Sequence, residues 1–94
     1  MAHPTILPVI EPDAGSKGHG GWTVTVFNND VNTYDEVMVI LVAATGCTFE
    51  EAAIETWEID HLGKSVVHFG QATECESVAA IISTIGIRVE VREE

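Results

Sequence analysis

Alternation of apolar and polar side chains predicts three strands in this chain of 94 residues. Residues 22–27 are rich in aromatic and β-branched side chains and alternate in polarity, which is typical of a strand with one buried face. Residues 65–69 form a second apolar and β-branched run of strand length. Residues 87–91 alternate cleanly, and Ile87 begins the face that we expect to be buried.

Three segments between these strands predict helices, and each opens with the same signal. In a capping box, a Thr side chain accepts a bond from the backbone amide of a Glu three residues later, and that Glu side chain accepts one from the Thr amide. The pairs are Thr33–Glu36, Thr48–Glu51 and Thr73–Glu76. Apolar positions at helical spacing follow each pair, and in the second helix Ala53 and Trp57 share the face that we expect to be buried. The order β-α-α-β-α-β predicts an α+β fold, a single compact domain with a three-stranded antiparallel sheet packed on three helices.

The first 21 residues have a different composition from the rest. All three prolines and four of the eight glycines lie there. Proline removes backbone donors and glycine raises the entropic cost of ordering the chain. We therefore expect residues 1–21 to be a flexible N-terminal tail and residues 22–94 to form the domain.

The charge balance is strongly acidic, with fifteen Asp and Glu against four Lys and Arg, and a net charge of −11. Phosphates of nucleic acids and anionic membranes both attract Lys and Arg, so we expect no nucleic acid and no membrane as partner. A cationic ligand is favoured, such as an ammonium group, a metal ion or a basic protein surface. The acidity also fits a role in solubility alone.

Two further observations predict a cytoplasmic protein. The sequence does not open with a basic segment before a long apolar run, and no apolar stretch approaches the roughly 20 residues that span a bilayer. Cys47 and Cys75 form no CxxC motif and permit one disulfide or two free thiols. Two thiols in a reducing cytosol is the simpler interpretation.

The motifs of several enzyme classes are missing. The chain has no G-x-S-x-G elbow, Walker A sequence or G-x-G-x-x-G loop, so we expect no enzyme and no cofactor. Asp60, His61 and His68 are possible metal ligands, but a structural zinc site needs four ligands at characteristic spacing. We expect no metal site and keep a metal-binding sensor as a rival hypothesis. The polar loop 28–32 fits ordinary turn chemistry and a recognition loop equally well.

Residues 26–37 (VFNNDVNTYDEV) resemble the hallmark of the ClpS family, a strand that leads through Asn-Asp-Asp into a helix. Residues 50–52, 61–64 and 65–67 are similar in order and spacing, and the resemblance covers about residues 22–92. It implies an adaptor that binds N-degrons, proteins with a free α-amino group and a bulky hydrophobic first residue. The adaptor would deliver them to a Clp-family AAA+ unfoldase for proteolysis. The alternative is a ClpS-like regulator that binds the unfoldase without recognising N-degrons.

The resemblance also implies a set of binding residues. The substrate's α-amino group would contact Asn28, Asn29, Asp30, Asp60 and His61. The pocket for its first side chain would be lined by Asn32, Tyr34, Val37, Thr56 and Ile87. The family usually has Asp where this chain has Asn29, and His where it has Asp60, with His61 one residue later. We therefore hypothesise that a carboxylate has moved from the loop to the second helix. A register shifted by one residue would instead place His61 in the site.

Overall fold

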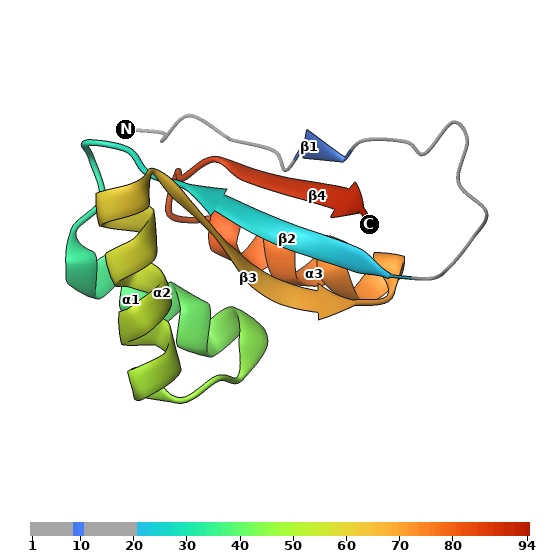
Figure 1. Ribbon diagram of the computed structural model, residues 1–94, viewed down its shortest axis with the longest axis horizontal. Coiled ribbons are helices and arrows are strands. Elements are labelled where there is room, and N and C mark those ends of the chain that lie inside the picture. Colours follow the sequence, from blue (N-terminus) through green and yellow to red (C-terminus); the bar gives the residue numbers. More distant parts are fainter. Residues whose placement is uncertain (1–8, 11–20) are drawn as a thin grey trace.

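The computed structural model describes residues 9–10 and 21–94, and Figure 1 shows their arrangement. The flexible tail predicted for residues 1–21 lies mostly outside these described residues, so it stays a prediction. The elements in chain order are β1 (Val9–Ile10), β2 (Trp22–Phe27), α1 (Tyr34–Thr45), α2 (Phe49–Leu62), β3 (Lys64–Gly70), α3 (Ala72–Ser83) and β4 (Val89–Glu93).

The sheet has the strand order β1-β4-β2-β3. Strand β2 pairs antiparallel with β3 on one side and with β4 on the other, which confirms the predicted three-stranded antiparallel sheet. The two-residue strand β1 adds a short parallel pairing at the β4 edge, with Val9 opposite Glu90, and the sequence did not predict it. Helix α3 lies across one face of the sheet, while α1 and α2 pack together at the end where β2 terminates (Figure 1).

The first two helices begin where their capping boxes predict. The Glu36 amide donates to Thr33 Oγ1 at 3.1 Å and the Thr33 amide donates to Glu36 Oε1 at 2.8 Å. The box at Thr48 has the same two bonds. These helices end at Gly46 and Gly63, whose φ angles of 74° and 91° favour glycine.

The third predicted capping box is wrong. Helix α3 already begins at Ala72, and its N-cap is Gln71, which makes no side-chain cap bond. Strand β3 continues through Gly70, so the chain enters the helix directly after the strand ends. Thr73 therefore lies inside the first turn, where its hydroxyl is too late in the sequence to cap the helix.

The core lies between the sheet and the helices. Its fully buried side chains include Val24 and Val26 of β2, Leu41 of α1 and Ile82 of α3. Helix α2 differs from the prediction, because Trp57 was placed on its buried face and is instead 48% exposed. The residues of α2 that are buried are Ala52, Thr56 and Ile59. An exposed aromatic ring is thereby left on the outer side of α2.

Candidate functional site

A small cavity of about 50 Å³ lies where the loop after β2, the first turn of α1 and the last turns of α2 meet. Its lining residues are Asn28, Asn29, Asn32, Thr33, Tyr34, Val37, Thr56, Ile59 and Asp60. The loop contributes mostly polar side chains, whereas the buried side chains of the two helices contribute apolar surface. The cavity therefore has one polar wall and one apolar wall.

Seven of the ten residues singled out in the sequence line this cavity. Two lining residues were missed, Thr33 and Ile59. Thr33 was interpreted only as a helix cap. Ile59 lies three residues after Thr56 on α2, so helical spacing from a residue already chosen could have found it.

The structure does not bring the other three residues to the cavity. Asp30 is exposed in the loop, and Ile87 is buried in the core. His61 lies on the outer side of α2, where its ring stacks on Trp57 with 4.3 Å between ring centroids. Its Nδ1 atom lies 3.0 Å from the Trp57 carbonyl oxygen. Of the adjacent pair Asp60 and His61, only Asp60 faces the cavity.

Every polar atom of the Asn29 side chain is engaged by other groups of the protein. Its Oδ1 accepts the backbone N–H groups of Val31 at 3.2 Å and Asn32 at 3.0 Å. Its Nδ2 donates to Asn32 Oδ1 at 2.8 Å and, more weakly, to the Gly86 carbonyl at 3.5 Å. Because two backbone N–H groups donate to one end of the Asn29 side-chain amide, that end must be the oxygen. Asn29 therefore shapes the loop and has no acceptor left for a ligand.

Asn32 ties the same loop to the far side of the domain. Its Nδ2 donates to the Ile85 carbonyl at 2.8 Å, in the turn between α3 and β4. Because this amide already receives the Asn29 donor at its oxygen, the two side chains lock each other's orientation. The polar wall of the cavity is thus rigidly held before any ligand arrives.

Acceptors for a cationic ligand remain at Asp60 and Asn28. The Asp60 side chain is 54% exposed, and Oδ2 lies 3.5 Å from His61 Nδ1. No Lys or Arg pairs with it among the described residues. The Asn28 Nδ2 atom is directed to the Asp60 carbonyl at 3.5 Å, which leaves the Asn28 Oδ1 as an acceptor. A carboxylate and a carbonyl oxygen together suit an ammonium group, which has three donors.

Tyr34 and Thr56 lie on the helical side of the cavity. The Thr56 hydroxyl donates to the Ala52 carbonyl at 2.6 Å, so this buried side chain is satisfied within its own helix. Tyr34 spans from α1 to α2, and its hydroxyl lies 3.4 Å from the Ala53 carbonyl, longer than a normal O–H···O bond. A cavity of about 150 Å³ holds benzene in another protein. The present 50 Å³ is much smaller, so a lining side chain such as Tyr34 must move before an aromatic ring can enter.

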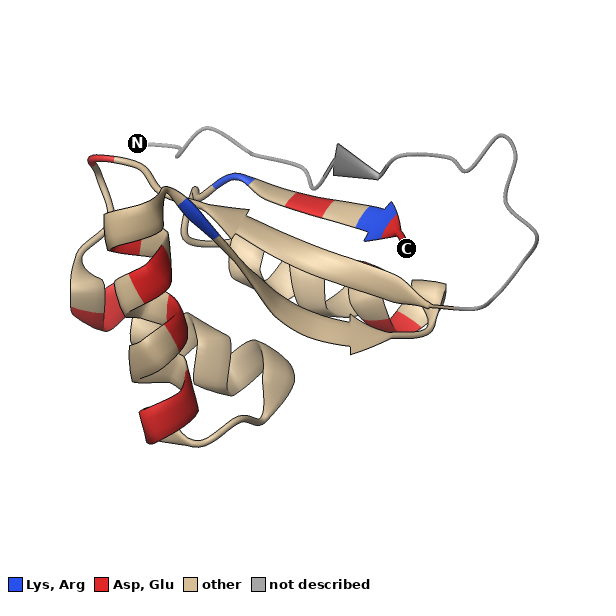
Figure 2. Cartoon of the chain, viewed as in Figure 1, with Lys and Arg blue, Asp and Glu red and all other residues tan. Residues whose placement is uncertain are grey.

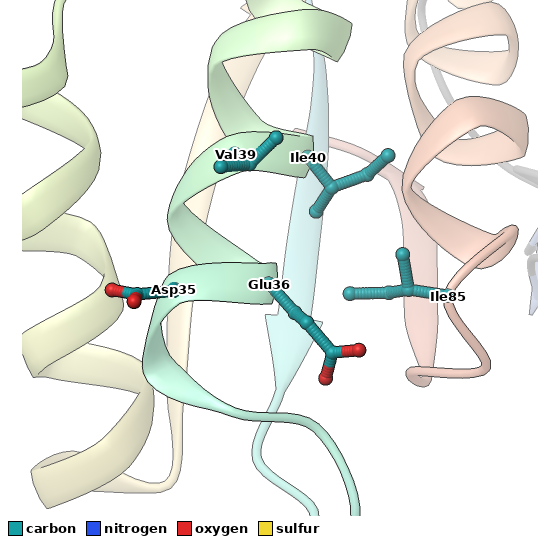
Figure 3. Close-up of a pocket in the computed structure, with 5 residues that line it drawn as sticks. All are labelled: Asp35, Glu36, Val39, Ile40 and Ile85. Carbon is teal, nitrogen blue, oxygen red and sulfur yellow. The ribbon is translucent and has the colours of Figure 1, made fainter.

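A larger hollow of about 330 Å³ lies on another side of α1 and is lined by Asp35, Glu36, Val39, Ile40 and Ile85. Figure 3 shows Ile40 and Ile85 directed toward each other, while Asp35 points to the other side of the helix. The Glu36 carboxylate is held by its capping box, and the bond from the Thr33 backbone, then that from Asn32, lowers its pKa. This hollow therefore presents an apolar surface and lacks the acceptors of the smaller cavity.

The rival metal site is not assembled in the described part of the chain. No three His, Cys, Asp or Glu side chains come together there as metal ligands. His68 faces Glu74 of α3, with 3.3 Å between Nε2 and Oε2, whereas Asp60 and His61 lie at the end of α2. Both cysteines are free thiols. None of the described helices is both long and apolar enough to cross a membrane.

Known proteins resemble this chain in sequence and in fold. The family model of the ATP-dependent Clp protease adaptor protein ClpS matches residues 17–89. The chain is 33% identical over 57 residues to the human E3 ubiquitin-protein ligase UBR2, a match that covers 61% of this chain and 3% of that protein. The structure of Agrobacterium tumefaciens ClpS2 bound to L-phenylalaninamide has the same fold, with a TM-score of 0.75, 17% identity, and coverage of 80% of this chain and 98% of that one. The chain therefore belongs to the ClpS family of ATP-dependent Clp protease adaptors, which are adaptors rather than enzymes.

Proposed function

We propose that this adaptor binds N-degrons, proteins that begin with a free α-amino group and a bulky hydrophobic residue, and delivers them in the cytoplasm to a Clp-family AAA+ unfoldase. One observation carries the proposal. Asp60 presents a carboxylate, with which no Lys or Arg of the described residues pairs, to a small cavity that also has an apolar wall. A free N-terminus with an apolar first side chain has the matching cation and apolar group.

The amino group is recognised by charge-assisted hydrogen bonds. An ammonium group that leaves water must find acceptors, because an unpaired buried charge is very unfavourable. Asp60 supplies a negative acceptor and Asn28 Oδ1 a neutral one, whereas Asn29 is fully engaged by other groups of the protein. A hydrogen bond to a charged group contributes about 1.5–3 kcal/mol. Asp60 is therefore the residue on which recognition of the amino group depends most.

The first side chain enters between α1 and α2. Val37 of α1 and Ile59 of α2 are buried apolar residues of its wall, and Thr56 of α2 is a third buried residue there. Tyr34 must swing away to admit a ring, and its long hydrogen bond to Ala53 restrains it only weakly. L-Phenylalaninamide, the ligand of the A. tumefaciens relative, carries both an α-amino group and a phenyl ring. That ligand supports the same division between a polar and an apolar wall.

The test is binding of a fluorescent peptide that begins with a free Phe, beside the same peptide acetylated at its N-terminus. We expect tight binding that acetylation abolishes. Asp60→Asn should weaken binding of the free peptide roughly tenfold to a hundredfold, since one charge-assisted bond is lost. Glu76→Gln makes the same charge change at an exposed position of α3 outside the cavity and should leave the affinity unchanged.

Two results would overturn the proposal. Equal binding of the free and acetylated peptides would mean that the amino group is not recognised. No binding of any peptide that begins with Phe, Tyr, Trp or Leu would mean that the cavity does not admit such residues. Either result would favour the regulator that binds the unfoldase without recognising N-degrons.

A further inference from the structure

A second, shallower hollow of about 380 Å³ adjoins the cavity and is lined by Tyr34, Ala53, Ile54 and Trp57. Tyr34 lines both spaces, so it is their common wall. Ile54 is 61% exposed, and together with Trp57 it gives α2 an exposed apolar outer face. Exposed apolar surface of this kind is unfavourable in water and typically marks a contact site.

The Trp57 ring forms a fixed aromatic platform beside this hollow. His61 stacks on it with an interplanar angle of 14°. The His61 ring is held in turn by the contact of its Nδ1 with the Trp57 carbonyl. One face of the indole is therefore covered by a neighbour on the same helix, and its orientation is set before a ligand binds.

The electrostatic surroundings of the hollow are negative. Helices α1 and α2 together carry seven Asp and Glu and no Lys or Arg. Neither helix shows a Lys or Arg in Figure 2; Lys64 follows α2 at the start of β3, and Arg88 and Arg92 lie before and on β4. Helical spacing places Glu50 one turn before Ile54, and Asp60 three residues after Trp57. Carboxylates therefore lie about one helical turn from two of the residues that line the hollow.

We propose that this hollow is the subsite for the second residue of the substrate and that it selects Lys or Arg there. The inference rests on the proposed function, in which the first residue occupies the cavity on the other side of Tyr34. Successive residues of an extended peptide advance by about 3.3–3.6 Å, so the second residue lies beside that shared wall. Lys and Arg combine an aliphatic stem, which suits Ile54 and Ala53, with a cation, which suits an indole face with carboxylates on the same helix.

The test uses peptides that begin with a free Phe and differ only at the second residue, which is Arg, Ala, Leu or Glu. We expect the Arg peptide to bind about fivefold more tightly than the Ala peptide, as a cation over an exposed indole contributes on the order of 1 kcal/mol. The Glu peptide should bind more weakly than the Ala peptide, because the negative surroundings repel it. The advantage of Arg should shrink at high salt.

Trp57→Leu keeps an apolar side chain on the half-exposed position and removes the ring. This variant should lose the preference for Arg and bind the Ala peptide as the unaltered protein does. Phe69→Ala removes an exposed aromatic residue of β3 and should keep the preference. If the peptide with Leu as its second residue bound as tightly as the one with Arg, the assignment of this hollow to a cationic second residue would be overturned.

The inference and the proposed function fail in different ways. If all four free peptides bind equally and acetylation still abolishes binding, the N-degron pocket stands and the second-residue subsite is refuted. The subsite is also refuted if Trp57→Leu weakens the Arg and Ala peptides by the same factor. If no peptide binds in an amino-dependent manner, the proposed function fails and the inference fails with it.

Discussion

Replacing Asn29 by Asp restores the carboxylate that ClpS sequences usually carry at this position, and we expect the change to be harmful here. The substitution exchanges the Nδ2 donor for an oxygen. That oxygen would face Asn32 Oδ1 at 2.8 Å and the Gly86 carbonyl at 3.5 Å, so two donated bonds become contacts between acceptors. Asn32 cannot compensate by turning its amide, because its Nδ2 already donates to the Ile85 carbonyl.

The cost follows from the shorter of the two contacts. The bond of 2.8 Å is a good hydrogen bond, whereas the one at 3.5 Å lies beyond the usual range and contributes little. Leaving one partly buried group unsatisfied costs about 1–3 kcal/mol, with about 2 kcal/mol as the central value. In a domain of this size each kcal/mol lost from the free energy of unfolding lowers the melting temperature by roughly 4–8 °C. We therefore expect Asn29→Asp to melt on the order of 10 °C lower than the unaltered protein.

Thermal unfolding followed by circular dichroism measures the effect, and a titration with the free Phe peptide measures binding. Asn28→Asp is the matched control, because it makes the same charge change one residue earlier and breaks only a weak bond of 3.5 Å. That control should melt within a few degrees of the unaltered protein. If Asn29→Asp melts like the control and binds the peptide more tightly, then Asn29 contacts the ligand and its role in the loop is refuted.

Three further outcomes follow from single side chains. Tyr34→Ala removes the side chain that is shared by the cavity and the adjoining hollow. In a competition assay, peptides that begin with Trp should then gain affinity relative to peptides that begin with Leu. An unchanged order of affinities would contradict the idea that Tyr34 limits the size of the cavity. Burial, and then the charges of two neighbouring glutamates, raise the pKa of Glu55 from 4.5 to about 7. Between pH 4.5 and about 7 the native state holds a proton on Glu55 that the unfolded state has released, so the free energy of unfolding falls as pH rises. Glu55→Gln should therefore raise the melting temperature at about pH 8 and not at about pH 4. Equal shifts at both pH values would refute the raised pKa of Glu55. Burial, and then the charge of a neighbouring glutamate, raise the pKa of the Cys75 thiol, so a thiol reagent should modify only Cys47 rapidly in the folded protein and both cysteines in denaturant.

The elements of this fold were predictable where the signal is local. The boxes at Thr33 and Thr48 fix their helices through partners only three residues away, and both helices begin there. The box at Thr73 has the same sequence pattern and forms no cap, because the end of β3 sets where α3 begins. Local pattern cannot report that constraint. The parallel pairing of β1 with β4 joins residues about 80 apart, and two residues carry too short a pattern to predict it.

The site shows the same division between local and distant partners. Most of its residues could be chosen because order and spacing resemble a known family. The role of Asn29 could not, because one of its partners, Gly86, is 57 residues away and only the folded chain brings it near. Helical spacing placed Trp57 on the buried face of α2, but the small residues Ala52 and Thr56 lie there, since they let α2 approach the core closely. The exposed ring is what creates the hollow beside the cavity.

The position of the carboxylate, rather than the acidity of the whole molecule, should decide recognition of the amino group. Asp60 and Asn28 flank the same cavity, so Asn28→Asp should recover most of the binding lost in Asp60→Asn, about tenfold or more, through a new charge-assisted bond. Asp30 is a carboxylate only two residues from Asn28, yet it does not line the cavity, so its presence should not restore binding in any of these variants. Asn29→Asp in the same background should not rescue binding, since that side chain faces the loop. Failure of Asn28→Asp to restore binding to a folded protein would show that Asp60 acts through the shape of α2 rather than through its charge.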